Sequence, residues 1–168
     1  MNYGTFSTSM SISFGLYCQG LGKCLLCNLL TTTFCEDKKK THEYTSAVDL
    51  FTRALESVEQ ERENERKERI LLQRSSVHYL VQNYSAADKD ATDALKLKCS
   101  TTGHFLKGII AERRNLLNNA IENYQMCVDW PDVVLIPGHN RNKYETIKRV
   151  QKFRNQQQNT YSVKRGFF

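Results

Sequence analysis

Four of the six cysteines lie in the first 35 residues, and they are the side chains of this chain best suited to metal chemistry. Cys24 and Cys27 have CxxC spacing, and Cys18 and Cys35 could complete a set of four thiolates for zinc. A structural zinc site usually has two such short turns, whereas this sequence has one CxxC and irregular flanking spacings. We therefore expect unliganded thiols and no bound metal, with a zinc-dependent N-terminal module as the alternative.

The four histidines do not assemble with other residues into a recognisable catalytic motif. His42, His78, His104 and His139 are scattered, and the sequence has no glycine-rich phosphate loop, no HExxH and no nucleophile elbow. Because catalysis must be argued from an assembled site, we interpret His78 and His104 as packing residues. The sequence therefore predicts a protein that is not an enzyme and needs no cofactor.

Composition and charge describe an ordinary soluble protein with one unusual end. The chain has 168 residues, of which 40% are hydrophobic and 25% charged, and this suits one domain. The net charge is +6, but residues 140–168 carry +7 and the remainder −1. The start, MNYGTFSTSM, lacks the basic region of a secretory signal, and polar residues such as Lys23 interrupt the apolar run 10–34. We expect a cytoplasmic protein with reduced thiols and no membrane-spanning helix.

With only two prolines and eight glycines, long stretches of the chain favour helix. Apolar spacing predicts helices over 44–58, 68–82, 84–98, 104–114, 117–128 and 142–157. The first runs on into charged residues up to 69, which include the favourable pairs Glu63–Lys67 and Glu65–Arg69. We interpret this stretch as the solvent-exposed end of that helix or a loop after it. The segment VVLIPG at 133–138 is short and apolar, and its Pro-Gly breaks it. In the last helix the residues expected to face inward are Tyr144, Ile147, Val150 and Phe153.

The same pattern of small residues occurs in three of these helices. Each has a small residue, a second residue four positions on and another small residue seven positions on: Ala47, Phe51 and Ala54; Ala87, Ala91 and Ala94; Ala120, Tyr124 and Cys127. Ser75 and Gly108 lie in the middle of the preceding helices. Small facing residues let two helices approach closely, and the next pair then stacks on them. The repeat predicts helical pairs stacked in an array.

Residues 71–98 and 102–132 carry this repeat most clearly, and they resemble the tetratricopeptide repeat, a helix–turn–helix unit of about 34 residues. Gln73-Arg74-Ser75 stands where the family's second repeat usually has Asn-Arg-Ala, and Lys107-Gly108 and Pro131 match its third repeat. The resemblance implies an all-α helix-turn-helix solenoid of about three repeats with a C-terminal capping helix. It divides the chain into an N-terminal segment (1–35), either poorly ordered or part of the first helix, helical repeats (36–139), and a basic cap and tail (140–168).

In this family the first helix of each repeat lines a concave groove that holds an extended peptide. The resemblance places nine residues in the groove: Arg69, Leu72, Gln73, Ser76, Tyr79, Leu80, Phe105, Ile109 and Arg113. Many relatives hold the acidic C-terminal tail of Hsp70 or Hsp90 with lysines, asparagines and an arginine. Here Gln73 replaces the asparagine, and Thr102 and Leu106 stand where lysine and arginine are expected. What remains suits the apolar side chains of a peptide or helix. The alternative is that the last helix or the N-terminal segment covers these residues.

The resemblance thus implies a protein-interaction module, an adaptor or co-chaperone-like scaffold that binds a protein or peptide partner. The basic C-terminal helix gives the alternative function, binding of nucleic acid or an acidic surface through Lys143, Lys148, Arg149, Lys152 and Arg154. A polar helix of this kind is also typical of the cap of a repeat array. We favour the interpretation of this helix as a cap. We therefore expect neither nucleic acid nor a membrane among the partners.

Overall fold

The computed structural model describes residues 12, 14–24, 37–58, 64–128, 134–136, 139–141, 148–156 and 158 of the chain. Within these ranges the main elements are the helices α2 (Asp37–Glu56), α3 (Asn64–Leu80), α4 (Tyr84–Leu97), α5 (Thr101–Arg113) and α6 (Leu117–Val128). Residues 14–24 and 148–156 are also helical, and we call them the N-terminal and C-terminal helices. The strands β1 (Val134–Ile136) and β2 (His139–Arg141) form an antiparallel pair.

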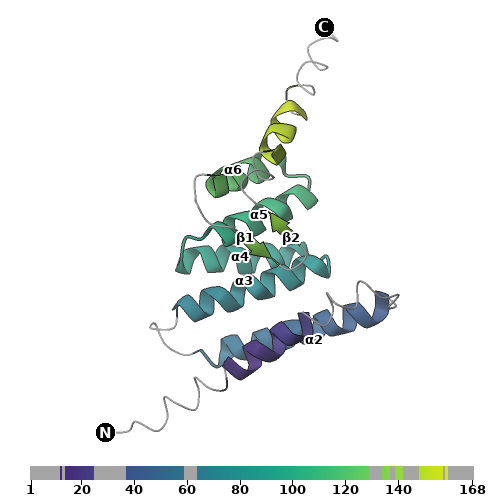
Figure 1. The fold of residues 1–168 in the computed structure, drawn as a ribbon, viewed down its shortest axis with the longest axis vertical. Helices are drawn as coiled ribbons and strands as arrows, with labels where there is room; N and C mark the ends of the chain where they lie inside the picture. Colours follow the sequence, from purple (N-terminus) through teal and green to yellow (C-terminus); the bar gives the residue numbers. More distant parts are fainter. Residues whose placement is uncertain are drawn as a thin grey trace.

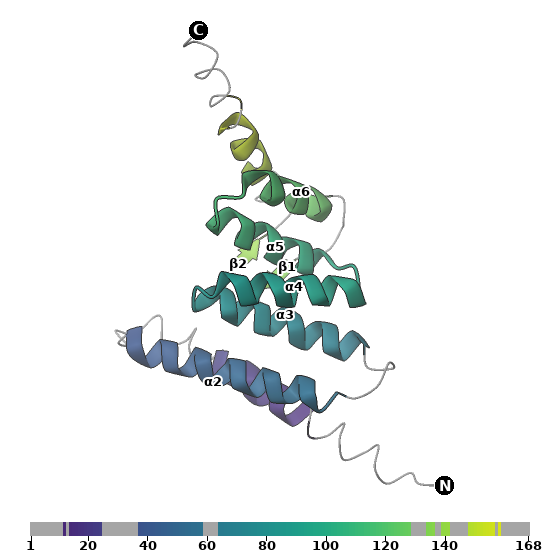
Figure 2. The ribbon, with the colours of Figure 1, turned by 180° about the vertical axis from the view of Figure 1, so that it is seen from behind.

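The helices follow one another as a stack. Each helix from α2 to α6 packs against the next, and α3 also contacts α5 (Figures 1 and 2). The predicted all-α fold class is confirmed for the described residues. One short departure is the β1–β2 pair, which forms on both sides of the predicted break at Pro137-Gly138, where we expected no strand.

Small residues do line the contact between α3 and α4. Ala87, Ala91 and Ala94 on α4 are fully buried, and so is Ser75 on α3. The Ser75 hydroxyl donates a hydrogen bond of 2.7 Å to the backbone carbonyl of Ala87. This bond satisfies the buried serine hydroxyl, so that the small residues of the two helices can pack closely.

The contact between α5 and α6 depends on Gly108 in the same way. A Cβ atom at this position would lie 2.5 Å from Cε1 of Tyr124, a distance that real contacts do not reach. The Tyr124 ring therefore packs directly on the backbone of α5. The predicted roles of Ser75 and Gly108 as close-approach residues are confirmed.

The N-terminal helix packs against α2 and occupies the place of the weakly predicted first helix. The Tyr17 and Phe51 rings lie 6.0 Å apart, and a Cβ at Gly20 would meet the Phe51 ring at 2.7 Å. Cys24 is buried in the same apolar cluster as Phe51. Of the alternatives for residues 1–35, residues 14–24 are thus part of a first helix, and 1–11, 13 and 25–35 lie outside the described residues.

The helix boundaries around the charged stretch differ from the prediction. The α2 helix begins at Asp37 rather than residue 44 and ends at Glu56, and Asn64 to Arg69 form the start of α3 instead of the end of α2. Polar residues at a helix start carry no apolar periodicity, so the hydrophobic pattern reports only the part of a helix that is buried. The Glu65–Arg69 pair does form, at 3.6 Å, and Glu63 lies outside the described residues.

The C-terminal helix closes the stack on α6. Val150 and Phe153 are buried as predicted, and the Phe153 ring stacks on Tyr124 with an interplanar angle of 4°. Arg149 pairs with Glu112 on α5, which also accepts a hydrogen bond of 2.8 Å from the Tyr124 hydroxyl. The predicted capping helix is confirmed over 148–156, while Tyr144 and Ile147 lie outside the described residues.

A buried ion pair and its hydrogen bonds join α2, α3 and α4. Arg74 on α3 donates two hydrogen bonds of 2.7 Å to the Asp90 carboxylate on α4 and one of 3.0 Å to the Thr52 hydroxyl on α2. Asp90 is buried, and Nε2 of His78 lies 3.8 Å from Oδ2, the oxygen that also accepts from Arg74 Nε. Burial lowers the pKa of His78 below its ordinary value of 6.5, because desolvation outweighs the attraction of Asp90.

Acidification is expected to destabilise the protein through His78. Since the pKa of His78 is lower in the folded state, the unfolded chain binds the proton first as the pH falls. The stability contributed by neutral His78 is therefore present above about pH 6.5 and is lost as the pH falls through the folded-state pKa. Urea unfolding at pH 7.5, 6 and 5 would measure this, and a His78→Gln variant should lose less stability over that range. An identical pH dependence in the variant would contradict the assignment.

Candidate peptide-binding face

One side of α3 carries four of the predicted groove residues, of which Ser76 is buried and Leu80 packs against the cluster that contains the α2 residues. Arg69, Gln73, Ser76 and Leu80 follow a spacing of four, three and four, which places them in one stripe. The Ser75 hydrogen bond fixes the side toward α4, and Ile70 and Val77 pack in the cluster that contains the α2 residues. We call the stripe on α3, together with the adjoining side of α5, the α3–α5 face.

The apolar groove residues belong to the core rather than to an open surface. Leu72, Tyr79, Phe105 and Ile109 are buried in a single hydrophobic cluster that joins α3 and α5. These side chains hold the two helices together. The sequence left them either open in a groove or covered by the last helix or the N-terminal segment, and in the structure they are part of the core between α3 and α5. Their role in peptide binding stays a prediction. Direct contact with a peptide would involve the more exposed residues around them.

The β1–β2 pair lies on the α3–α5 face. The N-terminal helix, α3 and α5 face the viewer in Figure 1, with the strands in front of them, whereas α2, α4 and α6 face the viewer in Figure 2. The contact of β1 with α5 agrees with this placement. The last helix and the N-terminal segment were the covers predicted from sequence, and the β1–β2 pair was not predicted. Its signals were the apolar run VVLI and the Pro-Gly that follows it.

Gln73 is the most unusual polar residue of the face. Its side chain is half-buried, and its amide oxygen Oε1 is buried with no hydrogen-bond partner, a condition shared among the described residues only by Thr101 Oγ1. A buried acceptor without a partner costs about 1–3 kcal/mol relative to one that is satisfied. No described residue donates to Gln73 Oε1, so a segment that contacts this half-buried side chain can supply the missing N–H group.

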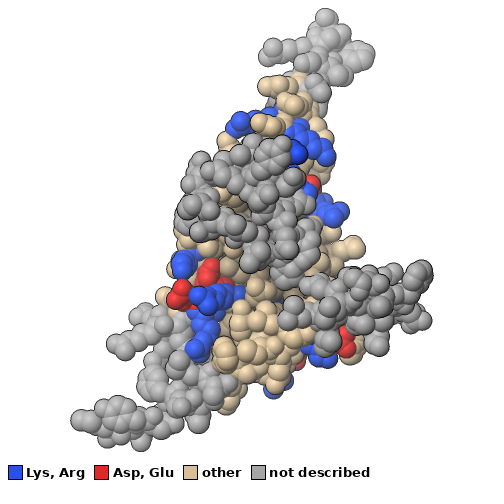
Figure 3. Space-filling model, in the orientation of Figure 1, with Lys and Arg blue, Asp and Glu red and all other residues tan. Residues whose placement is uncertain are grey.

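Two arginines extend the face at opposite ends. Arg113, in the last turn of α5, is exposed and donates through Nε to the Tyr79 hydroxyl at 3.1 Å, which raises the pKa of the guanidinium further. Arg69, near the start of α3, is 3.6 Å from Glu65. Lys98 also pairs with Glu65, at 3.2 Å, and its hydrogen bond and charge lower the pKa of that carboxyl. Figure 3 shows the resulting group of mixed charges at the edge where α3 begins and α4 ends.

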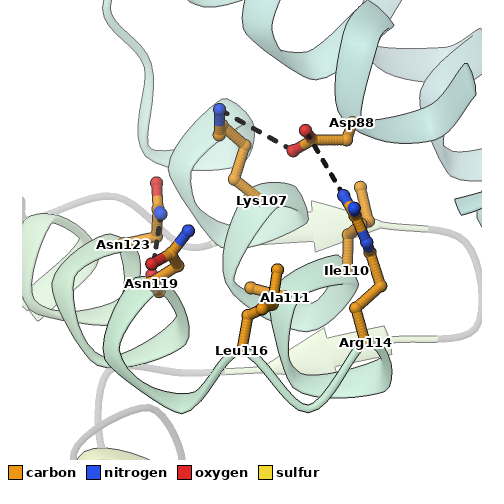
Figure 4. Close-up of a pocket in the computed structure, with 8 residues that line it drawn as sticks. All are labelled: Asp88, Lys107, Ile110, Ala111, Arg114, Leu116, Asn119 and Asn123. Atoms are coloured by element: carbon orange, nitrogen blue, oxygen red, sulfur yellow. Dashed lines mark hydrogen bonds and ion pairs between the residues drawn. The ribbon is translucent and has the colours of Figure 1, made fainter. Parts of the chain in front are cut away.

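The positions that would carry further clamp cations do not supply any to this face. Leu106 is buried and Thr102 is half-buried. The neighbouring Lys107 instead donates to the Thr92 hydroxyl at 2.7 Å and approaches Asp88 at 3.7 Å. These contacts belong to a small pocket between α4, α5 and α6, in which Asp88 lies between Lys107 and Arg114 (Figure 4). Both cations of that pocket lie within 4 Å of the Asp88 carboxylate.

The structure gives little support to the other sites predicted from sequence. Cys18 is exposed and Cys24 is buried, while Cys27 and Cys35 lie outside the described residues. Within those residues no three His, Cys, Asp or Glu side chains are grouped as a metal site would require. Arg149 pairs internally and Lys143 is not described, while Lys148, Lys152 and Arg154 are exposed on the basic helix. None of the described helices has the length and hydropathy needed to cross a bilayer.

The comparisons with known proteins give no family for this chain, so its function is inferred from its sequence and structure. The resemblance to tetratricopeptide repeats rests on the residues quoted above and stays a prediction. No family model matches the chain, and no curated protein sequence matches it.

Proposed function

We propose that this protein is a non-enzymatic interaction module, adaptor or co-chaperone-like, that binds an extended segment of a partner protein along the α3–α5 face. The observation that carries the proposal is the unpartnered Oε1 of Gln73. An extended peptide presents backbone N–H groups at regular intervals, and one of them would satisfy this acceptor. The gain is largest for a buried acceptor, because no water competes for it.

The position of β1 supports the same use of the face. This strand is an extended segment of the chain itself, and it lies against α5. A helix surface that accepts an extended backbone from its own chain has the shape to accept another beside it. The partner segment would run along the stripe of α3, where Arg69, Gln73 and Leu80 are at least partly exposed.

The charge at the ends of the face favours an acidic partner. Arg69 and Arg113 are both exposed, and guanidinium groups hold carboxylates through paired hydrogen bonds. An acidic tail with a free C-terminal carboxylate, of the kind that ends Hsp70 and Hsp90, is therefore the partner we propose. A cytoplasmic location fits such a partner. In this proposal Arg69 and Arg113 bind the carboxylates in place of the missing clamp cations.

Replacing Gln73 with methionine is expected to weaken peptide binding without weakening the fold. Methionine keeps the length of the side chain but removes the acceptor, so loss of one buried hydrogen bond should raise the Kd about tenfold. The free protein should be as stable or more stable, because an unsatisfied polar atom has been removed. Fluorescence anisotropy with a labelled acidic-tail peptide, at two salt concentrations, measures the Kd, and thermal melting measures stability.

Two controls make this result specific. Gln125→Met makes the same chemical change at an exposed position of α6 and should leave the Kd unchanged. A peptide with an amidated C-terminus should bind more weakly if a carboxylate is recognised. Equal affinity of the Gln73 and Gln125 variants, or no binding of the peptide to the unmodified protein, would overturn the proposal. Binding that depends steeply on salt and is lost when Lys152 and Arg154 are replaced would favour the alternative, a basic C-terminal surface.

A further inference from the structure

Three residues from separate elements form a polar chain at the opposite end of α5 from Arg113. Cys99 lies in the turn between α4 and α5 and is exposed. Its Sγ is 3.6 Å from Nε2 of His104, in the first turns of α5. The other ring nitrogen, Nδ1, is 3.2 Å from Oδ1 of Asn123 on α6. Neither the repeat pattern nor the proposed peptide binding uses this group.

The hydrogen bonds fix which atom carries each proton. The Asn123 amide nitrogen donates 2.8 Å to the backbone carbonyl of Asn119, which can only accept. The amide oxygen is therefore the atom that faces His104, and as an acceptor it requires the proton on Nδ1. In a neutral imidazole Nε2 is then unprotonated, and it faces the Cys99 thiol.

This is the arrangement of a thiol nucleophile with a general base and an orienting amide. As Cys99 attacks, its proton passes to Nε2, and Asn123 Oδ1 stabilises the imidazolium through the Nδ1 proton. The pocket in Figure 4 is lined by Asn123 but not by Cys99, and the sulfur is at the surface. An exposed sulfur outside a cleft suits reaction with a small molecule better than the turnover of a large substrate.

We propose that Cys99 is a modification site that forms a mixed disulfide with small-molecule disulfides of the glutathione type. The Cys99 thiolate attacks one sulfur of the disulfide, its S–S bond breaks, and a new S–S bond joins Cys99 to one half. The other half leaves as a thiolate and takes the proton from His104 Nε2. Cys99 is oxidised to the disulfide level and the leaving half is reduced to a thiol, so no further oxidant is needed.

The chain contains its own reference thiols. Cys18 is exposed on the N-terminal helix and measures the reactivity of an accessible cysteine. Cys127 is buried on α6, and burial raises the pKa of its thiol to about 12, so it should stay unmodified in the folded protein. Mass mapping of the peptides that contain these three residues compares their rates in one reaction.

The test treats the full chain with oxidised glutathione, quenches with acid at intervals and maps the added mass. We expect Cys99 to react at least about tenfold faster than Cys18, with His104→Gln reducing that advantage to none and Asn123→Ala reducing it several-fold. Melting temperatures of the variants confirm that they are folded. The pH profile distinguishes proton transfer from positioning alone: between pH 8 and 6 the Cys99 rate should fall less than the roughly tenfold per unit of an unassisted thiol.

The comparison of Cys99 with Cys18 in the unmodified protein tests the proposal even if a variant does not fold. Equal rates and equal pH profiles for Cys99 and Cys18 would overturn it, as would a His104→Gln variant that is folded and reacts at the original rate. Peptide binding at the α3–α5 face does not enter this experiment, so failure of that function leaves the result unaffected.

Discussion

Replacing Arg74 with methionine is expected to lower the free energy of unfolding by about 3–5 kcal/mol, the largest effect predicted for a single side chain. Arg74 makes a two-bonded pair with Asp90, whose side chain is only 5% exposed, and it also reaches Thr52. Removing the guanidinium leaves the Asp90 carboxylate buried without its main counter-charge, and His78 at 3.8 Å gives weak compensation. Urea denaturation at pH 7.5 measures the change as a shift of the midpoint.

The matched control removes both charges together. A variant that combines Arg74→Met with Asp90→Leu no longer buries a lone carboxylate, and apolar replacements of a buried ion pair are often neutral. We therefore expect the double variant to recover most of the stability lost by the single one. A single variant that loses less than about 1 kcal/mol would show that the pair behaves as an exposed one.

Replacing Gly108 with alanine is expected to destabilise the protein by about 1–3 kcal/mol. The new methyl group would meet the Tyr124 ring at 2.5 Å, and that ring has little freedom to move. It stacks on Phe153, contacts Phe105 and donates its hydroxyl proton to Glu112. Relief of the clash would therefore displace α6 and the C-terminal helix as well as α5. Thermal melting should show a fall of roughly 2–4 °C for each kcal/mol.

Gly22 is the control for the intrinsic effect of the substitution. It lies in the N-terminal helix, and nothing stands within 4 Å of the position that its Cβ would take. Gly22→Ala should be neutral or should stabilise by about 0.5–1 kcal/mol, because alanine favours helix more than glycine does. If Gly108→Ala were as stable as Gly22→Ala, the close approach of α5 to α6 would be wrong.

The helix stack could be predicted from sequence because its buried residues recur with helical spacing. The small residues of α4, Ala87, Ala91 and Ala94, and their partner Ser75 pointed to a close contact that the structure contains. The polar beginnings of α2 and α3 were not predicted, because residues that pack against nothing carry no period. The β1–β2 pair was missed because three-residue strands are too short for an alternation to be recognised.

The sites were less predictable than the fold, because they depend on contacts between helices. Sequence reasoning placed Gln73 on the peptide-binding side, but an acceptor without a partner can be recognised only when all its neighbours are in position. His104 was interpreted as a packing residue. Its relation to Asn123, nineteen residues away on α6, depends on how closely Gly108 lets the two helices approach.

The most direct test of the central claim is where an acidic-tail peptide contacts the folded chain. Titration of the peptide into isotope-labelled protein, followed by NMR, reports each backbone amide and the side-chain amide of Gln73. Peptide binding at the α3–α5 face predicts shifts concentrated on α3 and α5, with the Gln73 side chain among the largest and α2, α4 and α6 nearly unchanged. Shifts confined to residues 148–156, or no shifts at all, would contradict peptide binding at the α3–α5 face.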